Sequence, residues 1–140
     1  RGFNIDSFSA GVTADERFTR LTIVAHGDRL ILDQIRKQLA KLEDVISIKK
    51  LETGASVQRE LMLVKISAKD SDRQNVLSIT EIFKGRVVDV THDSMVIEIT
   101  GGQDKLAAFL DMLDGYEILE LARTGLTGLS RGSDDVTIIE

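Results

Sequence analysis

The fold is decided by Arg59–Glu60–Leu61–Met62–Leu63–Val64–Lys65–Ile66, in which a charged pair precedes a run of large apolar residues that includes one lysine. A short apolar run of this kind predicts a strand that is buried on both faces for much of its length. The preceding residues, Glu52–Ser56, are small or polar and lack periodicity, which predicts a linker. A complete structural unit follows the linker. The residues before the linker resemble a second copy of that unit without its beginning.

The unit that starts at Val57 is predicted to have the order β-α-β-β-α-β. After its first strand, Ser71 and Gln74 have the spacing of a capping box, which predicts the start of a helix. Strands are expected over residues 86–91, 95–100 and 116–121, with a turn at 92–94. The apolar faces of the two helices are Val76, Ile79, Thr80 and Phe83 in the first, and Leu106, Phe109, Leu110 and Leu113 in the second.

The N-terminal unit is predicted to have the order β-β-α-β. Residues 4–10 predict a strand with an irregularity that ends at Gly11, and residues 18–25 predict its hairpin partner after a polar connection. Gly27 and Asp28 end the second strand and start a helix. A further strand is expected over residues 45–51. The helix carries a single apolar stripe, formed by Ile31, Ile35, Leu39 and Leu42.

The two units form an internal repeat. Gly2–Asp6 resembles Gly85–Asp89, and the apolar residues after Gly27 have the spacing of those after Gly101. The first copy therefore lacks the opening strand and helix of the second, and we expect the natural protein to be longer at this end. Two crossed β-α-β units that share an antiparallel sheet form a ferredoxin-like sandwich. We therefore predict an α+β chain with two ferredoxin-like (βαββαβ) domains.

The predicted domain organisation is a first domain over residues 1–53, a linker over 54–56, a second domain over 57–125 and a terminal tail over 126–140. A ferredoxin-like sandwich has helices on only one face of its sheet. A half-bare sheet that also lacks a strand and a helix has too small a core to be stable alone. We therefore expect a homodimer or a larger assembly.

Composition excludes several classes of function. The 140-residue chain is 42% hydrophobic and 29% charged, as is usual for a globular protein, and it has no apolar run long enough for a bilayer and no signal-peptide pattern. The absence of cysteine excludes disulfides and thiolate chemistry and favours a reducing compartment, the cytoplasm. A net charge of −5 with 4% aromatic residues argues against nucleic acid as a partner.

Three separated motifs carry a family resemblance: residues 2–7 (GFNIDS), residues 59–65 (RELMLVK) and residues 123–125 (RTG). Shorter matches lie at 37–42, 83–90 and 128–132. In this order and at these separations, the motifs resemble the regulatory (small) subunit of acetolactate synthase, also called acetohydroxyacid synthase. The resemblance covers nearly the whole chain.

This resemblance implies that residues 1–53 form an ACT domain, a ligand-sensing version of the ferredoxin-like fold. In that family the subunit does no chemistry and needs no cofactor. It binds the thiamine-diphosphate-dependent catalytic subunit, raises its activity and confers feedback inhibition by valine or another branched-chain amino acid. Family members carry a strand and an Asn/Gly-containing loop before the first helix, and this chain lacks both.

The resemblance also implies the ligand-binding residues. Asn4 is expected at the ACT dimer interface, where its amide supplies both a donor and an acceptor to a free amino acid, beside the backbone of Ile5. Ile5 also offers an apolar wall. Ala10 and Gly11 lie on the same hairpin and permit close approach of a ligand or of the catalytic subunit. From the residues alone, the scarcity of binding sites favours Asn4 as the start of a strand. Ala10 and Gly11 equally belong to a hairpin turn.

Other candidate sites are weaker. His26 and His92 have no second ligand at metal-binding spacing, so no metal site is expected. Residues 92–94 (His-Asp-Ser) predict a turn rather than a catalytic triad, and the Gly-rich segment 125–132 predicts an extended terminal segment rather than a phosphate loop. Glu60 and Lys65 are expected to be solvated or ion-paired.

Three alternative functions remain to be compared with the leading one. An RNA-recognition module shares the β-α-β-β-α-β order, but it needs stacking aromatic residues that strands 86–91 and 95–100 lack. A small enzyme on this fold would need a nucleophile–base pair or a carboxylate pair, and no such pair is recognisable. An ACT-type amino-acid-sensing regulator of a different enzyme is the remaining alternative, and the motif at residues 59–65 argues against it.

Overall fold

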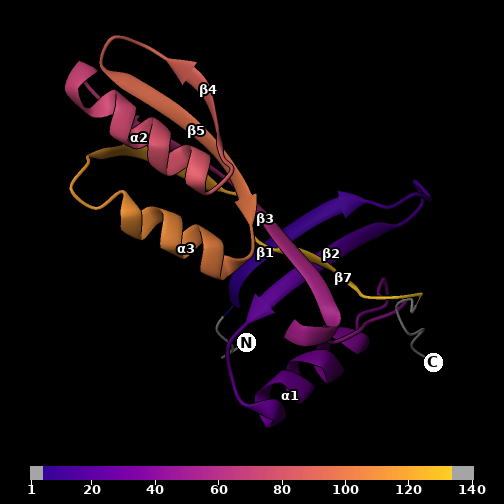
Figure 1. The fold of residues 1–140 in the computed structure, drawn as a ribbon. Helices are drawn as coiled ribbons and strands as arrows, with labels where there is room; N and C mark the ends of the chain where they lie inside the picture. Colours follow the sequence, from indigo (N-terminus) through magenta and orange to yellow (C-terminus); the bar gives the residue numbers. More distant parts are fainter. Residues whose placement is uncertain (1–4, 134–140) are drawn as a thin grey trace. The chain divides into compact units, whose positions relative to one another are not determined.

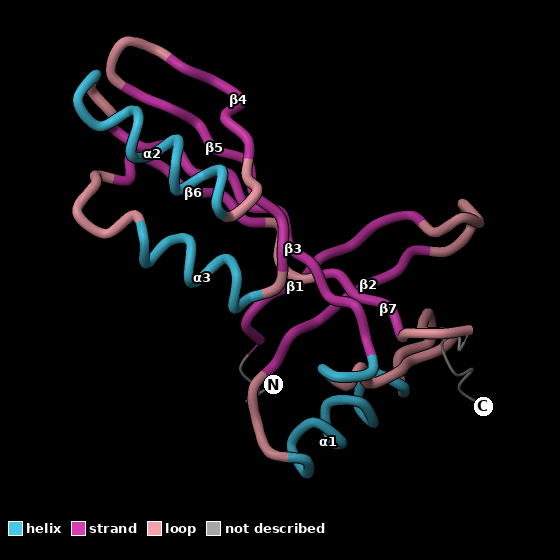
Figure 2. The backbone as a smooth tube through the Cα atoms, in the orientation of Figure 1, coloured by secondary structure: helices cyan, strands magenta, loops and turns pink. Residues whose placement is uncertain are grey.

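The structure is a computed structural model that describes residues 5–133. The chain divides into two units: unit 1 comprises Arg1–Gln58 and Leu126–Glu140, and unit 2 comprises Arg59–Gly125. Figures 1 and 2 show the elements of both units. In chain order they are β1 (Ile5–Val12), β2 (Thr19–Ala25), α1 (Arg29–Ala40), a short 3₁₀ helix (Thr53–Ala55), β3 (Ser56–Ser67), α2 (Asp70–Ile82), β4 (Arg86–Val90), β5 (Ser94–Gly101), α3 (Gln103–Met112), β6 (Ile118–Arg123) and β7 (Thr127–Ser130).

Unit 2 is an antiparallel sheet with the strand order β4-β5-β3-β6, and helices α2 and α3 lie together along it (Figure 1). The element order β3-α2-β4-β5-α3-β6 is the predicted one. Its core is a cluster of side chains from the helices and from the facing side of β3 and β5. The fully buried members are Met62, Val64, Ile66, Ala68, Val76, Ile97 and Phe109 with Leu106, Ile99 and Leu113, and Met95 is nearly so.

The prediction that β3 is buried on both faces is wrong. Met62, Val64 and Ile66 are completely buried, whereas Leu63 between them is 39% exposed and Lys65 is half-buried. Successive side chains of a strand point to opposite faces of the sheet, and both helices cover the same face. The sheet therefore has a single packed face.

Both helices of unit 2 use their predicted apolar faces. Phe83 and Phe109 pack edge to face, with ring centroids 5.5 Å apart and an interplanar angle of 77°. The buried hydroxyl of Thr80 donates a 2.8 Å hydrogen bond to the carbonyl oxygen of Val76, so its polar atom has a partner. The ring contact joins the C-terminal end of α2 to α3, whereas the Thr80 bond lies within α2.

The predicted capping box at Ser71–Gln74 does not form. Helix α2 begins at Asp70, one residue before Ser71, and its N-cap, Lys69, makes no side-chain capping bond. The N-terminus of α2 is stabilised instead by the negative charges of Asp70 and Asp72 in its first turn, which interact favourably with the positive end of the helix dipole.

Unit 1 contains the hairpin of β1 and β2 and the helix α1. The strand register shifts between Ile5 and Ser7, which confirms the predicted irregularity. Asp28 caps α1 as predicted, since its carboxylate accepts a 3.0 Å hydrogen bond from the backbone N–H of Ile31. No residue of α1 is buried. In the described part of unit 1, Leu126 is the one buried hydrophobic side chain.

The predicted strand over residues 45–51 is wrong, because only a single bridge residue, Ser47, forms there. A strand needs a hydrogen-bonded neighbour, and β1 and β2 pair only with each other in the described structure. Apart from the Ser47 bridge, residues 45–51 therefore form no strand.

Strand β7 lies in the segment that the sequence predicts to be a tail. It pairs with β3, and the N–H of Arg131 donates a 2.9 Å hydrogen bond to the carbonyl oxygen of Ala55. The approach is close at Gly128, where an added Cβ would lie 3.0 Å from Leu51 Cδ1 and 3.2 Å from the carbonyl oxygen of Val57. A side chain at position 128 therefore fits only if these neighbours shift by a few tenths of an ångström.

We expect Gly128→Ala to lower the free energy of unfolding by about 1–3 kcal/mol, the usual cost of overpacking. Gly11→Ala is the matched control, because a Cβ at Gly11 meets no atom within 4 Å. Thermal and urea unfolding of both variants measures the difference. Equal stability of the two variants would contradict the close packing of β7.

Candidate functional site

The hairpin of β1 and β2 carries the predicted ligand-binding residues that the structure describes. Ile5 pairs with Ala25 at one end of the hairpin, and Gly11 pairs with Arg20 near the other. Asn4, the sharpest of the predicted site residues, lies outside the described residues. Ile5, Ala10 and Gly11 are all exposed.

The structure does not bring Ile5 together with Ala10 and Gly11. They lie on one strand, and six residues at about 3.3 Å per residue separate Ile5 from Gly11 by roughly 20 Å. A free amino acid cannot touch both ends of this strand at once. Within one copy of the chain, the predicted residues therefore form two separate contact points.

The small size of Gly11 is not required by the packing of the described chain, since a Cβ there meets no atom within 4 Å. Around it, the hairpin exposes large apolar side chains. The exposed ones on β1, β2 and their connection are Ile5, Phe8, Val12, Phe18 and Leu21.

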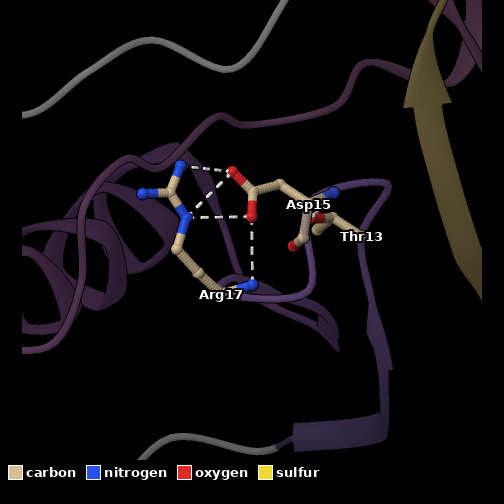
Figure 3. Close-up of polar contacts among 3 residues, drawn as sticks. All are labelled: Thr13, Asp15 and Arg17. Atoms are coloured by element: carbon tan, nitrogen blue, oxygen red, sulfur yellow. Dashed lines mark hydrogen bonds and ion pairs between the residues drawn. The ribbon is translucent and has the colours of Figure 1, made fainter.

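The turn between β1 and β2 is held by its own polar side chains (Figure 3). The hydroxyl of Thr13 donates to the carbonyl oxygen of Asp15 at 2.7 Å, and Arg17 Nη2 donates to Asp15 Oδ2 at the same distance. The side-chain hydrogen bond from Arg17 is the main cause that lowers the pKa of Asp15 below its usual value, and the Arg17 backbone N–H adds to it. The Arg17 guanidinium also lies over the ring of Phe18, 5.4 Å from its centroid.

Neither histidine belongs to a metal site in the part of the chain that the structure describes, where no cluster of metal-ligating side chains occurs. His26 Nδ1 pairs with the carboxylate of Asp6 at the open end of the hairpin. His92 is exposed in the tight connection between β4 and β5. Across residues 5–133, no helix combines the length and the apolar character needed to cross a bilayer.

The sequence did not predict the contacts between the hairpin and the β7 segment, which comprises Leu126 and β7. The hydroxyl of Ser9 donates a 3.1 Å hydrogen bond to the carbonyl oxygen of Leu126, and Arg20 Nη2 donates one of 3.0 Å to that of Gly128. The bonding partners are more than 100 positions apart in the chain. No sequence periodicity signals such contacts, because their acceptors are backbone carbonyls, which every residue carries.

Glu60 makes the most buried ion pair among the described residues. Its side chain is 5% exposed, and it accepts hydrogen bonds from Arg123 Nη2 at 2.8 Å and from Arg123 Nε at 3.2 Å. The same carboxylate accepts a 2.9 Å bond from the N–H of Gly125. The sequence predicts that Glu60 and Lys65 are each solvated or ion-paired. Both are ion-paired, and Lys65 pairs with Glu120 at 3.1 Å on the surface, whereas Glu60 is buried.

We expect Glu60→Ala to lower the free energy of unfolding by about 2–4 kcal/mol, because it leaves the buried N–H of Gly125 without an acceptor and Arg123 without a counter-ion. Glu120→Ala is the matched control on the neighbouring strand. The Lys65–Glu120 pair lies at the surface, with side chains 44% and 71% exposed, so its loss costs less than about 1 kcal/mol. Urea unfolding compares the two variants, and an equal cost would contradict a special role for the buried carboxylate.

Two family models match the chain and together cover both units. The model described as the AHAS small subunit-like ACT domain matches residues 1–47, and the model described as the small subunit of acetolactate synthase matches residues 59–132. The first matches the unit that contains the hairpin, and the second begins at β3 and extends through β7.

Individual proteins agree with the family models. A probable acetolactate synthase small subunit from Methanothermobacter thermautotrophicus is 48% identical over 134 residues, which is 95% of this chain and 80% of the relative. The acetolactate synthase isozyme 3 small subunit of Escherichia coli is 46% identical over 133 residues, 94% of this chain and 82% of the relative. The crystal structure of the acetolactate synthase small subunit from Thermotoga maritima has a TM-score of 0.86 and 35% identity, covering 96% of this chain and 84% of that one.

The fold and the matches first define a class: a two-unit α+β protein with an ACT domain at its N-terminus. This confirms the predicted fold class. The chain belongs to the acetolactate synthase small-subunit family, as the sequence resemblance implies, and its role is that of a regulatory subunit.

Proposed function

We propose that this chain binds the catalytic subunit of acetolactate synthase, raises its activity and makes it subject to feedback inhibition by valine or another branched-chain amino acid. The catalytic subunit supplies thiamine diphosphate and performs the chemistry, and this chain contributes no cofactor. The observation that carries the proposal is that family matches cover both units, residues 1–47 and 59–132. The proposal includes action in the cytoplasm.

A homodimer fits the state of unit 1. Its described hairpin has no further paired strand, its helix α1 has no buried residue, and large apolar side chains stand exposed on β1 and β2. Unpaired strand edges and exposed apolar side chains are the features that a second copy of the chain covers. A second copy would also supply the contact that a single strand cannot, because Ile5 and Gly11 lie too far apart to hold one amino acid.

Different residues are proposed to bind the polar and the apolar parts of a branched-chain amino acid. Asn4 binds the charged α-ammonium or carboxylate group, since an amide offers both a donor and an acceptor. Ile5 contributes a backbone contact and part of an apolar wall, while Ala10 and Gly11 leave room beside the strand. The open space around Gly11 supports this assignment.

Inhibition then follows from a shift between two arrangements of the holoenzyme. The effector changes the population of these arrangements only to the extent that it binds one of them better. Binding between ACT domains of two chains meets this condition, because the contact exists only in the arrangement that brings them together. The catalytic subunit is less active in the arrangement that the effector favours.

The alternative is an ACT-type regulator of a different enzyme. The match of residues 59–132 to the acetolactate synthase small subunit argues against it, because this match lies outside the ACT domain. An RNA-recognition module is opposed by the lack of aromatic residues on β4 and β5.

The test of this function is acetolactate formation by the cognate catalytic subunit, with and without this chain and with and without valine. We expect higher activity with the chain and its loss when valine is added. Leucine and isoleucine identify the preferred effector in the same assay. If a competent catalytic subunit is unaffected by the chain, the proposed function is wrong. Activation without any amino-acid response would refute the sensing part alone.

Asn4→Ala tests the ligand contact. Loss of a hydrogen bond to a charged group predicts a decrease of about 1.5–3 kcal/mol in valine binding free energy, measured by calorimetric titration of the chain. Activation of the catalytic subunit is expected to persist, because Asn4 contacts the effector. An unchanged valine affinity would remove Asn4 from the site.

A further inference from the structure

The proposed effector hairpin is attached to the β7 segment by two hydrogen bonds that flank Ala10 and Gly11. Ser9 directly precedes Ala10 on β1, and Arg20 is the register partner of Gly11 on β2. Their acceptors are the carbonyl oxygens of Leu126 and Gly128, at 3.1 Å and 3.0 Å. The residues on either side of Ala10 and Gly11 therefore both bind the segment formed by Leu126 and β7.

Both acceptors belong to one short segment, which consists of β7 and the residue before it, Leu126. Strand β7 also contacts β2 and pairs with β3. The backbone at Gly128 lies close to that of Val57, since an added Cβ would be 3.2 Å from the Val57 carbonyl oxygen.

The segment that leads into β7 is held at its other end by Glu60. The N–H of Gly125 and the guanidinium of Arg123 both donate to this carboxylate. Thr124 adds a reciprocal contact: its N–H donates to the carbonyl oxygen of Leu61 at 3.1 Å, and the N–H of Leu61 donates to the Thr124 hydroxyl at the same distance. The last residue held by Glu60, Gly125, is bonded directly to the first residue held by the hairpin, Leu126.

We propose that β7 carries the effector signal from the hairpin of unit 1 to the end of strands β3 and β6 in unit 2, and that Arg20 and Ser9 are the positioning residues that connect the hairpin to it. This inference rests on the proposed function and adds its internal route. An effector that settles beside Ala10 and Gly11 changes the position or the population of the hairpin. Ser9 and Arg20 move with it, and their carbonyl acceptors follow.

The charge of Arg20 makes it the stronger of the two connections. A hydrogen bond with an ionised donor is roughly twice as strong as one between neutral groups. Arg20 is half-buried, so its bond is less screened than that of Arg17, whose side chain is 80% exposed. Arg17, on the same hairpin, pairs instead with Asp15 inside the turn. Arg17 therefore serves as a matched control, because it carries the same charge on the same hairpin.

The test compares Arg20→Ala, Arg20→Lys, Ser9→Ala and Arg17→Ala in the full-length chain reconstituted with the catalytic subunit. The coupling is measured as the ratio of activity without valine to activity at saturating valine. Effector couplings typically correspond to roughly 5- to 150-fold changes, and we expect Arg20→Ala to reduce the ratio by up to about tenfold. Ser9→Ala reduces it less, Arg20→Lys restores much of it, and Arg17→Ala leaves it unchanged.

Two further measurements separate a signalling role from a structural one. Calorimetric titration of the chain alone is expected to give the same valine affinity for Arg20→Ala as for the unchanged chain. Arg20→Ala is also expected to activate the catalytic subunit as the unchanged chain does. Amide hydrogen exchange at residues 127–130 is expected to become faster in Arg20→Ala and to stay the same in Arg17→Ala.

An inhibition curve of Arg20→Ala that matches Arg17→Ala would overturn the proposal. A parallel loss of valine affinity would also overturn it, because Arg20 would then act on the ligand site itself. If Arg20→Ala fails to assemble, Ser9→Ala and Arg20→Lys decide the question by the same ratio. If the unchanged chain neither activates nor responds to valine, the proposed function fails, and hydrogen exchange still shows whether Arg20 holds β7.

Discussion

The one-sided burial of β3 is the constraint that governs the packing of unit 2. Met62, Val64 and Ile66 are completely buried, and the matching residues of β5 and of both helices complete the same core. A domain of this size has little apolar surface to bury, so its stability depends on using one face of the sheet fully. The intervening residues, Leu63 and Lys65, are then left toward solvent or a partner.

Unit 1 follows the opposite principle. Among its described residues, Leu126 is the only hydrophobic side chain that is buried, and it comes from the segment that follows unit 2 in the chain. The hairpin and α1 leave large apolar side chains exposed, which a folded protein normally covers. Under the proposed function, a second copy of the chain and the effector would cover these side chains.

Unit 2 is inserted in the sequence between the two parts of unit 1. The chain leaves unit 1 at Gln58, forms unit 2 and returns to unit 1 at Leu126. Glu60 lies at the start of unit 2 and accepts hydrogen bonds from Arg123 and Gly125 at its end. A carboxylate buried to this extent needs all its partners, because a buried charge without them is costly. The same ion pair thus fixes unit 2 and fixes the start of the segment that contacts the hairpin.

Local sequence chemistry is sufficient for the element order of unit 2, the hairpin with its irregularity, the cap of α1 and the family. Apolar periodicity selects strand or helix, Asp28 satisfies free N–H groups, and the motifs around residues 2–7 and 59–65 are contiguous. The spacing of apolar residues also identifies Val76, Leu106 and Phe109 as core residues.

Long-range contacts decide which face of β3 is covered, that residues 45–51 lack a strand partner, and that β7 belongs with the hairpin. They also decide the partners of Ser9, Arg20 and Glu60, while the extended run of β1 sets the wide separation of the predicted ligand contacts. Several of these contacts use backbone carbonyls or N–H groups as partners. Since every residue carries such groups, no side-chain pattern encodes which of them will meet, and the fold must bring them together first.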